Sequence, residues 1–283
     1  MVITMPVNQA IFISDLHAGC QFGLCPPKVN LDGGGSYTQS ALQAKIWLWW
    51  LDFRKVWVPT VTKGEPYILV VNGDTTDGRH HGAVTLVSNN LADQQNIAYE
   101  ILAPWRDDPM LKELILIRGT ECHVGPAAEN EERLAQRLGA MQDDLGRSSR
   151  FEAWLDLDGC LVQVLHHIGA TGSMSYETTA LMKEYAEVCS EAARWNRKSP
   201  DVVVRSHRHR KAEIRVPIEN GDGICFTTPG WQLKTPYVFR IPGGRISTPQ
   251  FGGSLVRKGD RVHYTEHFVK TTERPPILSI RGK

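Results

Sequence analysis

Residues 114–125 read LILIRGTECHVG, a short apolar run that ends at a glycine and then presents a glutamate and a histidine. The run has the length and the aliphatic composition of a buried strand. Its polar tail begins where the strand would end, which is where the sheets of α/β proteins carry their binding groups. The stretch therefore predicts a strand of an α/β sheet with functional groups at its carboxyl end.

Similar apolar runs recur along the chain. They predict further buried strands at residues 10–14, 67–71, 161–165 and 202–204. The intervening patterns predict helices at residues 37–56, 86–102, 127–138 and 176–196. Strands that alternate with helices indicate an α/β sandwich.

The C-terminal part has a different pattern, with shorter runs typical of antiparallel strands. They lie at residues 224–230, 236–241, 253–258 and 261–269. These strands fit either a second sheet or a mixed edge of the first. We expect one domain over residues 1–283, in which the β-rich part at 224–270 completes the second sheet.

Composition argues against several classes of protein. The 32 Lys and Arg residues nearly balance the 31 Asp and Glu residues, so no overall field draws the chain to nucleic acid or a membrane, although residues 205–215 form a local basic run. No stretch approaches the roughly 18 apolar residues of a membrane span. The first residues lack the pattern of a signal peptide. Six scattered cysteines fit reduced thiols, and we expect a cytoplasmic protein.

Most of the ten histidines follow the ends of the predicted strands. The carboxyl ends of strands in an open α/β sheet line one crevice, so these histidines predict a shared site. The members of this group are His17, His80, His81, His123, His166, His167, His207 and His209.

Spacing refines this prediction. Asp15 and His17 are two residues apart, as are His207 and His209, and residues at this spacing face the same side of an extended backbone. Adjacent His166 and His167 would face opposite sides, so we expect only one of them to be a ligand. Imidazole and carboxylate groups suit zinc, iron or manganese rather than calcium. Two ions sharing a bridging carboxylate would use the six candidates Asp15, His17, Asp74, His166, His207 and His209.

Taken together, these motifs resemble the signature of the calcineurin-like metallophosphoesterases, and their style resembles phage and prophage members. That signature runs Asp-x-His, Gly-Asp-x-x-Asp, Gly-Asn-His, a single His, and Gly-His-x-His. The matching stretches are DLH (15–17), GDTTD (73–77), GTECH (119–123), HH (166–167) and SHRH (206–209). The resemblance implies a two-sheet β-sandwich flanked by helices. It also implies a dinuclear centre, for which we expect manganese, with iron, zinc, nickel or magnesium as alternatives.

The resemblance also implies a role for each residue. Asp15, His17 and His209 would bind the first metal, Asp74 would bridge, and His166 and His207 would bind the second. His123 would protonate the leaving oxygen or steady the phosphate, and Asp77 would orient a metal ligand. Substrate contacts are expected from Arg79, Arg118, Arg208 and His81, with Arg205 and His80 as further candidates; placement at the surface is the alternative for each.

Two departures from the family pattern stand out. Ser206 replaces the glycine of the last motif, and the asparagine expected before His123 is absent. Thr120 holds that place by count from the glycine. We expect Glu121 to be the ligand instead, because a carboxylate binds such cations better than a hydroxyl does. An ion pair of Glu121 with Arg118 is the rival interpretation.

The activity implied by the resemblance is hydrolysis of a phosphate ester by a hydroxide that two metal ions activate. A phosphodiester of nucleotides or nucleic acid is the expected substrate. The basic run 205–215 would lie beside the site, and Trp231 would either stack on a base or belong to the core. The alternatives are a phosphomonoesterase acting on proteins or small molecules, and a non-catalytic metal-binding scaffold.

Overall fold

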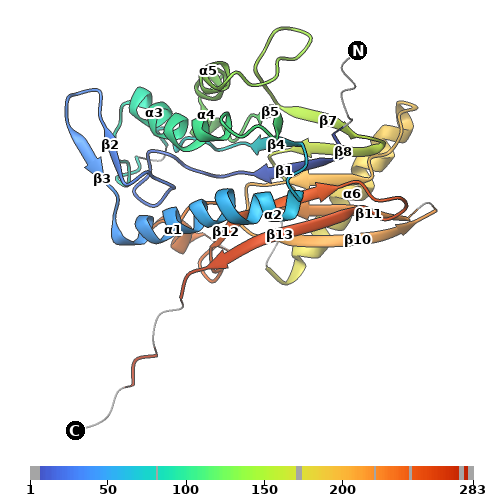
Figure 1. Ribbon diagram of the computed structural model, residues 1–283. Coiled ribbons are helices and arrows are strands. Elements are labelled where there is room, and N and C mark those ends of the chain that lie inside the picture. Colours follow the sequence, from blue (N-terminus) through green and yellow to red (C-terminus); the bar gives the residue numbers. More distant parts are fainter. Residues whose placement is uncertain are drawn as a thin grey trace.

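The computed structural model describes residues 7–80, 82–169, 174–219, 221–241, 244–273 and 277–279. Two β-sheets pack face to face, and helices cover the outer face of each (Figure 1). This architecture confirms the predicted α/β sandwich of two sheets flanked by helices. Among the described residues, no helix is long and apolar enough to cross a membrane.

The first sheet has six strands in the order β13-β12-β1-β4-β5-β6. Its central strands β1, β4 and β5 run parallel, so their carboxyl ends lie at one edge. The bounds are β1 (Gln9–Ile13), β4 (Tyr67–Asn72), β5 (Leu111–Ile117), β6 (Ser149–Arg150), β12 (Gln250–Arg257) and β13 (Tyr264–Thr271).

The second sheet has five strands in the order β10-β11-β9-β8-β7. Strands β8, β9 and β11 run parallel at its centre. The bounds are β7 (Glu152–Leu157), β8 (Cys160–Leu165), β9 (Val202–Arg205), β10 (Ala212–Ile218) and β11 (Gly221–Thr227). A separate hairpin of β2 (Lys28–Asn30) and β3 (Ser36–Thr38) forms within the loop after β1.

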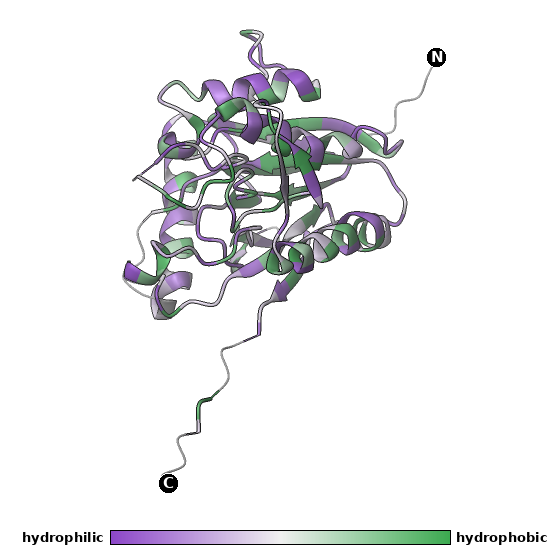
Figure 2. Ribbon diagram, turned by 90° about the vertical axis from the view of Figure 1, so that its left-hand side faces the viewer, coloured by the Kyte–Doolittle hydropathy of each residue, from purple (hydrophilic) through white to green (hydrophobic). Residues whose placement is uncertain are grey.

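Buried side chains fill the space between the two sheets and the space beneath the outer helices. Between the sheets, Phe12 and Val70 share a cluster with Val204 and Phe226. Outside the first sheet, an aromatic cluster that includes Trp231 packs under the helices, so Trp231 belongs to the core rather than to a substrate surface. The strands are accordingly mostly green in Figure 2, while the helices carry both colours.

The predicted helices are present with shifted ends. The first continues through a π-helical turn, η1 (Phe53–Trp57), into α2 (Val58–Thr62). A capping box at its start, formed by Ser40 and Gln43, explains why helix begins there. The four long helices are α1 (Ala41–Asp52), α3 (Leu91–Leu102), α5 (Glu129–Leu138) and α6 (Glu177–Arg194). Shorter elements are the 3-10 turns η2 (Ala103–Trp105) and η3 (Met174–Tyr176) and the one-turn helix α4 (Glu121–Val124).

For the C-terminal part, completion of the second sheet holds only for β11, the alternative of a mixed edge of the first sheet holds for β12 and β13, and the expected strand at 236–241 is wrong. Of the strands within 224–270, β11 joins the second sheet, whereas β12 and β13 extend the first, because β12 pairs antiparallel with β1. The run 236–241 is not a strand. It contains the 3-10 helix η4 (Val238–Arg240), since Val238 N donates to Thr235 O within a local turn (3.0 Å).

Candidate metal centre

The loops after five strands, β1, β4, β5, β8 and β9, meet at one edge of the sandwich. Asn72, the last residue of β4, joins the two sheets there, because its Nδ2 donates to Leu165 O (3.2 Å) and to Ser206 Oγ (2.7 Å). Ser206 thus holds the sheets together, and its backbone φ is not positive. The turn needs no glycine at this position, as the sequence suggested.

The candidate ligands adopt an unusual backbone conformation. Nine non-glycine residues in the described part have positive φ, and five of them are candidate ligands. Such conformations cost free energy in residues with a Cβ and cluster at functional sites. The expected same-side orientation of Asp15 with His17 therefore arises from left-handed turns and not from extended backbone. The five are Asp15 (54°), His17 (45°), Asp74 (52°), His207 (70°) and His209 (51°).

The first group of ligand atoms comes from Asp15, His17 and His209. His209 Nε2 lies 3.2 Å from Asp15 Oδ1 and 3.2 Å from His17 Nε2. Asp15 Oδ2 accepts hydrogen bonds from Ser14 Oγ and from His207 N, but no hydrogen bond in the described residues reaches the buried Oδ1. A buried carboxylate oxygen without a hydrogen bond, facing two imidazole nitrogens, fits a divalent cation.

The second group surrounds Asp74, which is buried. Its Oδ2 lies 3.1 Å from His166 Nε2 and 3.9 Å from His207 Nδ1. His166 Nδ1 donates to Asn72 O (2.6 Å), which points Nε2 at the centre. Burial opposes the charged imidazole, but the Asp74 carboxylate outweighs it and raises the pKa of His166 to about 10. The proton on His166 Nε2 faces Asp74 Oδ2, a position that also suits a metal cation.

Asp74 connects the two groups. A carboxylate oxygen of Asp74 lies within 4.8 Å of ligand nitrogens of His17 and His123, and its Oδ2 lies 3.1 Å from His166 Nε2. The two sets therefore share one carboxylate, as a bridged pair of ions requires.

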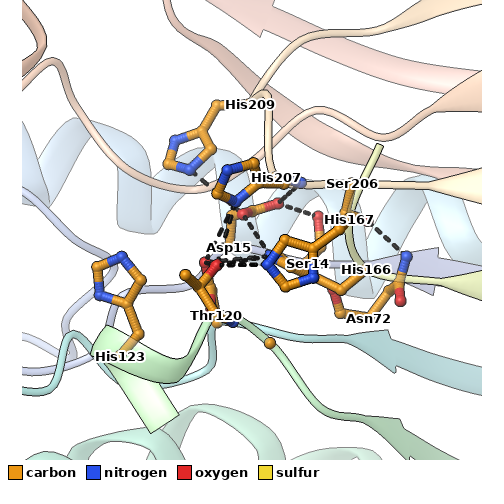
Figure 3. A network of polar contacts seen from close by, with 12 residues as sticks. Ser14, Asp15, Asn72, Thr120, His123, His166, His167, Ser206, His207 and His209 are labelled. Atoms are coloured by element: carbon orange, nitrogen blue, oxygen red, sulfur yellow. Dashed lines mark hydrogen bonds and ion pairs between the residues drawn. The ribbon is translucent and has the colours of Figure 1, made fainter. Parts of the chain in front are cut away.

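Thr120, and not Glu121, contacts the second group of candidate ligands (Figure 3). Thr120 Oγ1 donates to Asp74 Oδ2 (3.1 Å) and lies 3.2 Å from His207 Nδ1 and 3.5 Å from His166 Nε2. Glu121 is exposed at the start of α4 and makes no hydrogen bond or ion pair with the cluster or with Arg118. The Glu121 carboxylate is therefore directed away from the candidate ligands, because α4 begins at Glu121 and its side chain faces solvent.

Both adjacent histidines reach the second group, although extended backbone would turn them to opposite sides. Strand β8 ends at Leu165, and the alternation of an extended backbone ends with it. His167 Nε2 lies 3.3 Å from Thr120 Oγ1, and the ligand nitrogens of His166, His167 and His207 all lie within 4.8 Å of one another. His166 is buried and His167 is exposed.

Behind the first group, Asp77 orients side chains as the sequence suggested. Its Oδ1 accepts from His17 Nδ1 (3.0 Å) and from Gln232 Nε2 (3.2 Å), and its Oδ2 faces His80 Nε2 (3.3 Å). The bond to Nδ1 leaves Nε2 of His17 to face the centre. A ligand held this way keeps its orientation whether or not a cation is bound.

His123 faces the same centre from α4. Its Nδ1 donates to Asp77 O (2.6 Å), and its ring lies edge-on to His17 with 4.6 Å between centroids. Burial, together with the charge of His17, lowers the pKa of His123 to about 4. The imidazole is therefore neutral at pH 7 in the absence of ligands, with Nε2 able to take up a proton.

Sequence analysis missed Glu131, a buried residue of α5 beneath the centre. Its Oε1 accepts from Thr75 N (3.1 Å) and its Oε2 from Gly119 N (2.7 Å), so one carboxylate ties the loop after β4 to the loop after β5. In the sequence it stands in the run ENEER, which reads as a solvated face. No local signal distinguishes it from Glu129 and Glu132, which are only partly buried.

The expected arginines Arg79, Arg118 and Arg208 make contacts with groups other than the candidate ligands. Arg118 Nε donates to Ser149 Oγ (2.9 Å), and its guanidinium pairs with Glu132 (3.5 Å). Arg79 is exposed, and its Nε donates to Asn89 O (2.6 Å). Arg208 is half-buried and donates to Gly169 O. His81 lies outside the described residues.

Ion pairs neutralise much of the basic run 205–215. Acidic partners lie beside three of its arginines, which offsets part of the positive charge that the sequence suggested. The pairs are Arg205–Glu184 (2.7 Å), Arg210–Glu177 (2.8 Å) and Arg215–Glu213 (3.0 Å).

Comparison with known proteins yields only distant likenesses. No family model and no curated protein matches the sequence. Among solved structures, a predicted phosphoesterase from Streptococcus pneumoniae is 10% identical, with a TM-score of 0.36 over 94% of this chain and 100% of that one. Vacuolar Protein Sorting 29 from Cryptosporidium parvum is 9% identical, with a TM-score of 0.38 over 95% and 100%. At these values the likeness carries no functional conclusion.

The contacts of Thr120 lead to a prediction that separates it from Glu121. We expect Thr120→Ala to weaken binding of the more weakly held manganese ion by about 10- to 100-fold, the range for groups that support a metal site. Glu121→Asn serves as the matched control and should leave both affinities unchanged, since its side chain faces solvent. Calorimetric titration with manganese measures both. The opposite ranking of the two variants would return the ligand role to Glu121.

Proposed function

We propose that the protein is a phosphoesterase that holds two divalent ions and hydrolyses a phosphodiester of nucleotides or nucleic acid. The observation that carries this proposal is the convergence of strand ends on two ligand groups that share Asp74. A mixed set of carboxylate oxygens and imidazole nitrogens supports manganese as the metal. The free state of all six cysteines supports a cytoplasmic location, which is the host cytoplasm if the chain is phage-encoded.

In this proposal one set of residues binds the metal ions and another residue transfers a proton. Asp15, His17 and His209 would hold one ion, and His166 and His207 the other, with Asp74 between them. When bound, the ions would supply Lewis acidity and an activated water for in-line attack on phosphorus.

Proton transfer to the leaving oxygen falls to His123 in this proposal. Its Nδ1–H is held by Asp77 O, so Nε2 is the atom that would carry a proton to the leaving oxygen. Because the pKa of the buried ring lies near 4, Nε2 has to gain this proton as the anionic substrate arrives.

A leaving-group series tests the role of His123. We expect His123→Ala to reduce kcat by about 100-fold or more for esters with poor leaving groups, the usual range for a lost general acid, and by less for p-nitrophenyl esters. Metal content should stay unchanged. Steady-state rates with aryl phosphodiesters of rising leaving-group pKa measure the effect, and a uniform loss across the series would contradict the acid role.

A paired assay tests the function itself. With manganese bound, we expect faster hydrolysis of bis-p-nitrophenyl phosphate than of p-nitrophenyl phosphate. Chelation should abolish both rates, and added manganese should restore them. Faster turnover of the monoester would make the protein a phosphomonoesterase. Stoichiometric metal without hydrolysis of either ester would make it a non-catalytic scaffold.

A further inference from the structure

One surface segment, residues 233–241 and 244–247, begins and ends near the candidate metal centre. Just before it, Gln232 Nε2 donates to Asp77 Oδ1 (3.2 Å). Just after it, Gln250 N donates to His209 O (3.4 Å). Both ends are thus fixed to residues that present or orient the candidate ligands. The chain therefore leaves the neighbourhood of the centre at one end of this segment and returns to it at the other.

The segment is basic and has no acidic residues to offset its charge. Between Asp222 and Asp260 the sequence contains no aspartate or glutamate. Lys234, Arg240 and Arg245 lie in the segment, and the two arginines are exposed. In the described part of the chain, neither guanidinium has an acidic partner. This contrasts with the run 205–215, whose arginines are largely paired.

The same segment exposes aromatic rings beside its charges. Tyr237 is 51% exposed and Phe239 is 58% exposed, on either side of the start of η4. Lys234 Nζ lies 4.3 Å from the Phe239 ring centroid and donates to Ser247 O (3.1 Å), which holds the segment in shape. Large exposed rings on a fixed basic segment are typical of surfaces that hold single-stranded nucleic acid.

We propose that residues 233–241 and 244–247 form the surface on which single-stranded nucleic acid lies as its phosphodiester enters the metal centre. Bases stack on Tyr237 and Phe239, and phosphates pair with Arg240 and Arg245. This inference rests on the proposed function, because it names the substrate class of that site. Exposed rings stack only on bases whose faces are free, which a duplex does not offer, so the strand is single.

Binding of a labelled strand tests the surface. The probe is a short fluorescein-labelled phosphorothioate oligothymidylate, which resists hydrolysis, and the protein is the full chain loaded with manganese. We expect Tyr237→Leu/Phe239→Leu to weaken binding by about tenfold or more, because stacking is lost while apolar bulk remains. We expect Arg240→Gln/Arg245→Gln to lower the salt slope of log K by about 1.4, since each phosphate contact contributes about 0.7 for single strands.

Controls separate stacking from general effects. Trp195→Leu/Arg194→Gln removes an exposed ring and a charge at the far end of α6 and should leave binding unchanged. Polyphosphate carries charge without bases, so the leucine pair should bind it as the unaltered protein does. Circular dichroism checks that each variant folds. If the Tyr237→Leu/Phe239→Leu variant does not fold, the single variant Phe239→Leu is used in its place.

Three results would overturn the inference: unchanged oligothymidylate binding by the leucine variant, equal loss of polyphosphate binding, or tighter binding of duplex than of single strands. Hydrolysis of bis-p-nitrophenyl phosphate by the unaltered protein is measured separately. If the unaltered protein hydrolyses the diester but does not bind oligothymidylate, the proposed surface is wrong while the proposed phosphoesterase function stands. Absence of diester hydrolysis rejects the proposed function, while the binding measurement still decides the surface.

Discussion

Asp74→Asn should abolish metal-dependent hydrolysis, lowering kcat by about a thousandfold or more, because the two candidate ion sites lose the carboxylate that they share. Asp74 is buried, with Oδ2 3.1 Å from His166 Nε2 and Oδ1 accepting from Thr120 N (2.6 Å). Asparagine has the same shape, and its oxygen can still accept from Thr120 N. The fold should therefore be kept while the charge that attracts cations is lost.

Metal content and kcat at saturating manganese measure this effect together. Asp93→Asn is the matched control, since Asp93 is also buried and accepts from Asp32 N (2.7 Å) and Ser88 Oγ at the start of α3. It makes the same chemical change away from the candidate ligands and should leave turnover intact. Near-normal turnover of the Asp74 variant with metal saturated would contradict the two-ion assignment.

Replacing Glu131 by alanine should lower both stability and turnover. The change leaves the buried N–H groups of Thr75 and Gly119 without their acceptor. At about 1–3 kcal/mol for each unsatisfied group, the free energy of unfolding should fall by about 3 kcal/mol. The loops that carry Asp74 and Thr120 then lose their shared anchor, so kcat and manganese affinity should fall as well. Urea unfolding and metal titration measure the two effects.

Glu132→Ala is the control for Glu131, because it makes a similar loss on the same helix. Its carboxylate accepts from Ser148 N (2.9 Å) and Ser149 N (2.9 Å), away from the centre. We expect this variant to lose stability while kcat and manganese affinity are retained. Equal catalytic losses in both variants would show that Glu131 acts only through general stability.

The pH dependence of stability gives a second measurement on Glu131. Burial, and then the charge of Asp74, raise the pKa of Glu131 from 4.5 to about 7. A folded-state pKa above the unfolded value favours the folded state below pH 4.5, and this contribution is lost as pH rises to 7. In metal-free protein, the difference in unfolding free energy between the unaltered chain and Glu131→Gln should therefore change over this range. A constant difference would show that Glu131 does not titrate there.

Much of the fold follows from local pattern. Short Val-, Ile- and Leu-rich runs identified the buried strands β1, β4, β5, β8 and β9, and helical spacing identified the four long helices. Exposed or partly exposed strands such as β7 and β10 escaped prediction, since their polar residues interrupt the continuous apolar runs that identified the buried strands. The sequence did not decide between the two sheets for β12, because pairing with β1 depends on residues far apart in the chain.

The sequence by itself determined which residue types follow which strands, and hence the ligand candidates Asp15, His17, Asp74, His166, His207 and His209, because strand order and spacing are local properties of the chain. Only the tertiary structure decided which neighbours complete the centre and which charges remain available. Thr120 and His167 enter it, Glu121 turns to solvent, and Glu131 supports it from below. The physical reason is that hydrogen-bond satisfaction and ion pairing depend on groups brought together from distant parts of the chain, which no local spacing encodes.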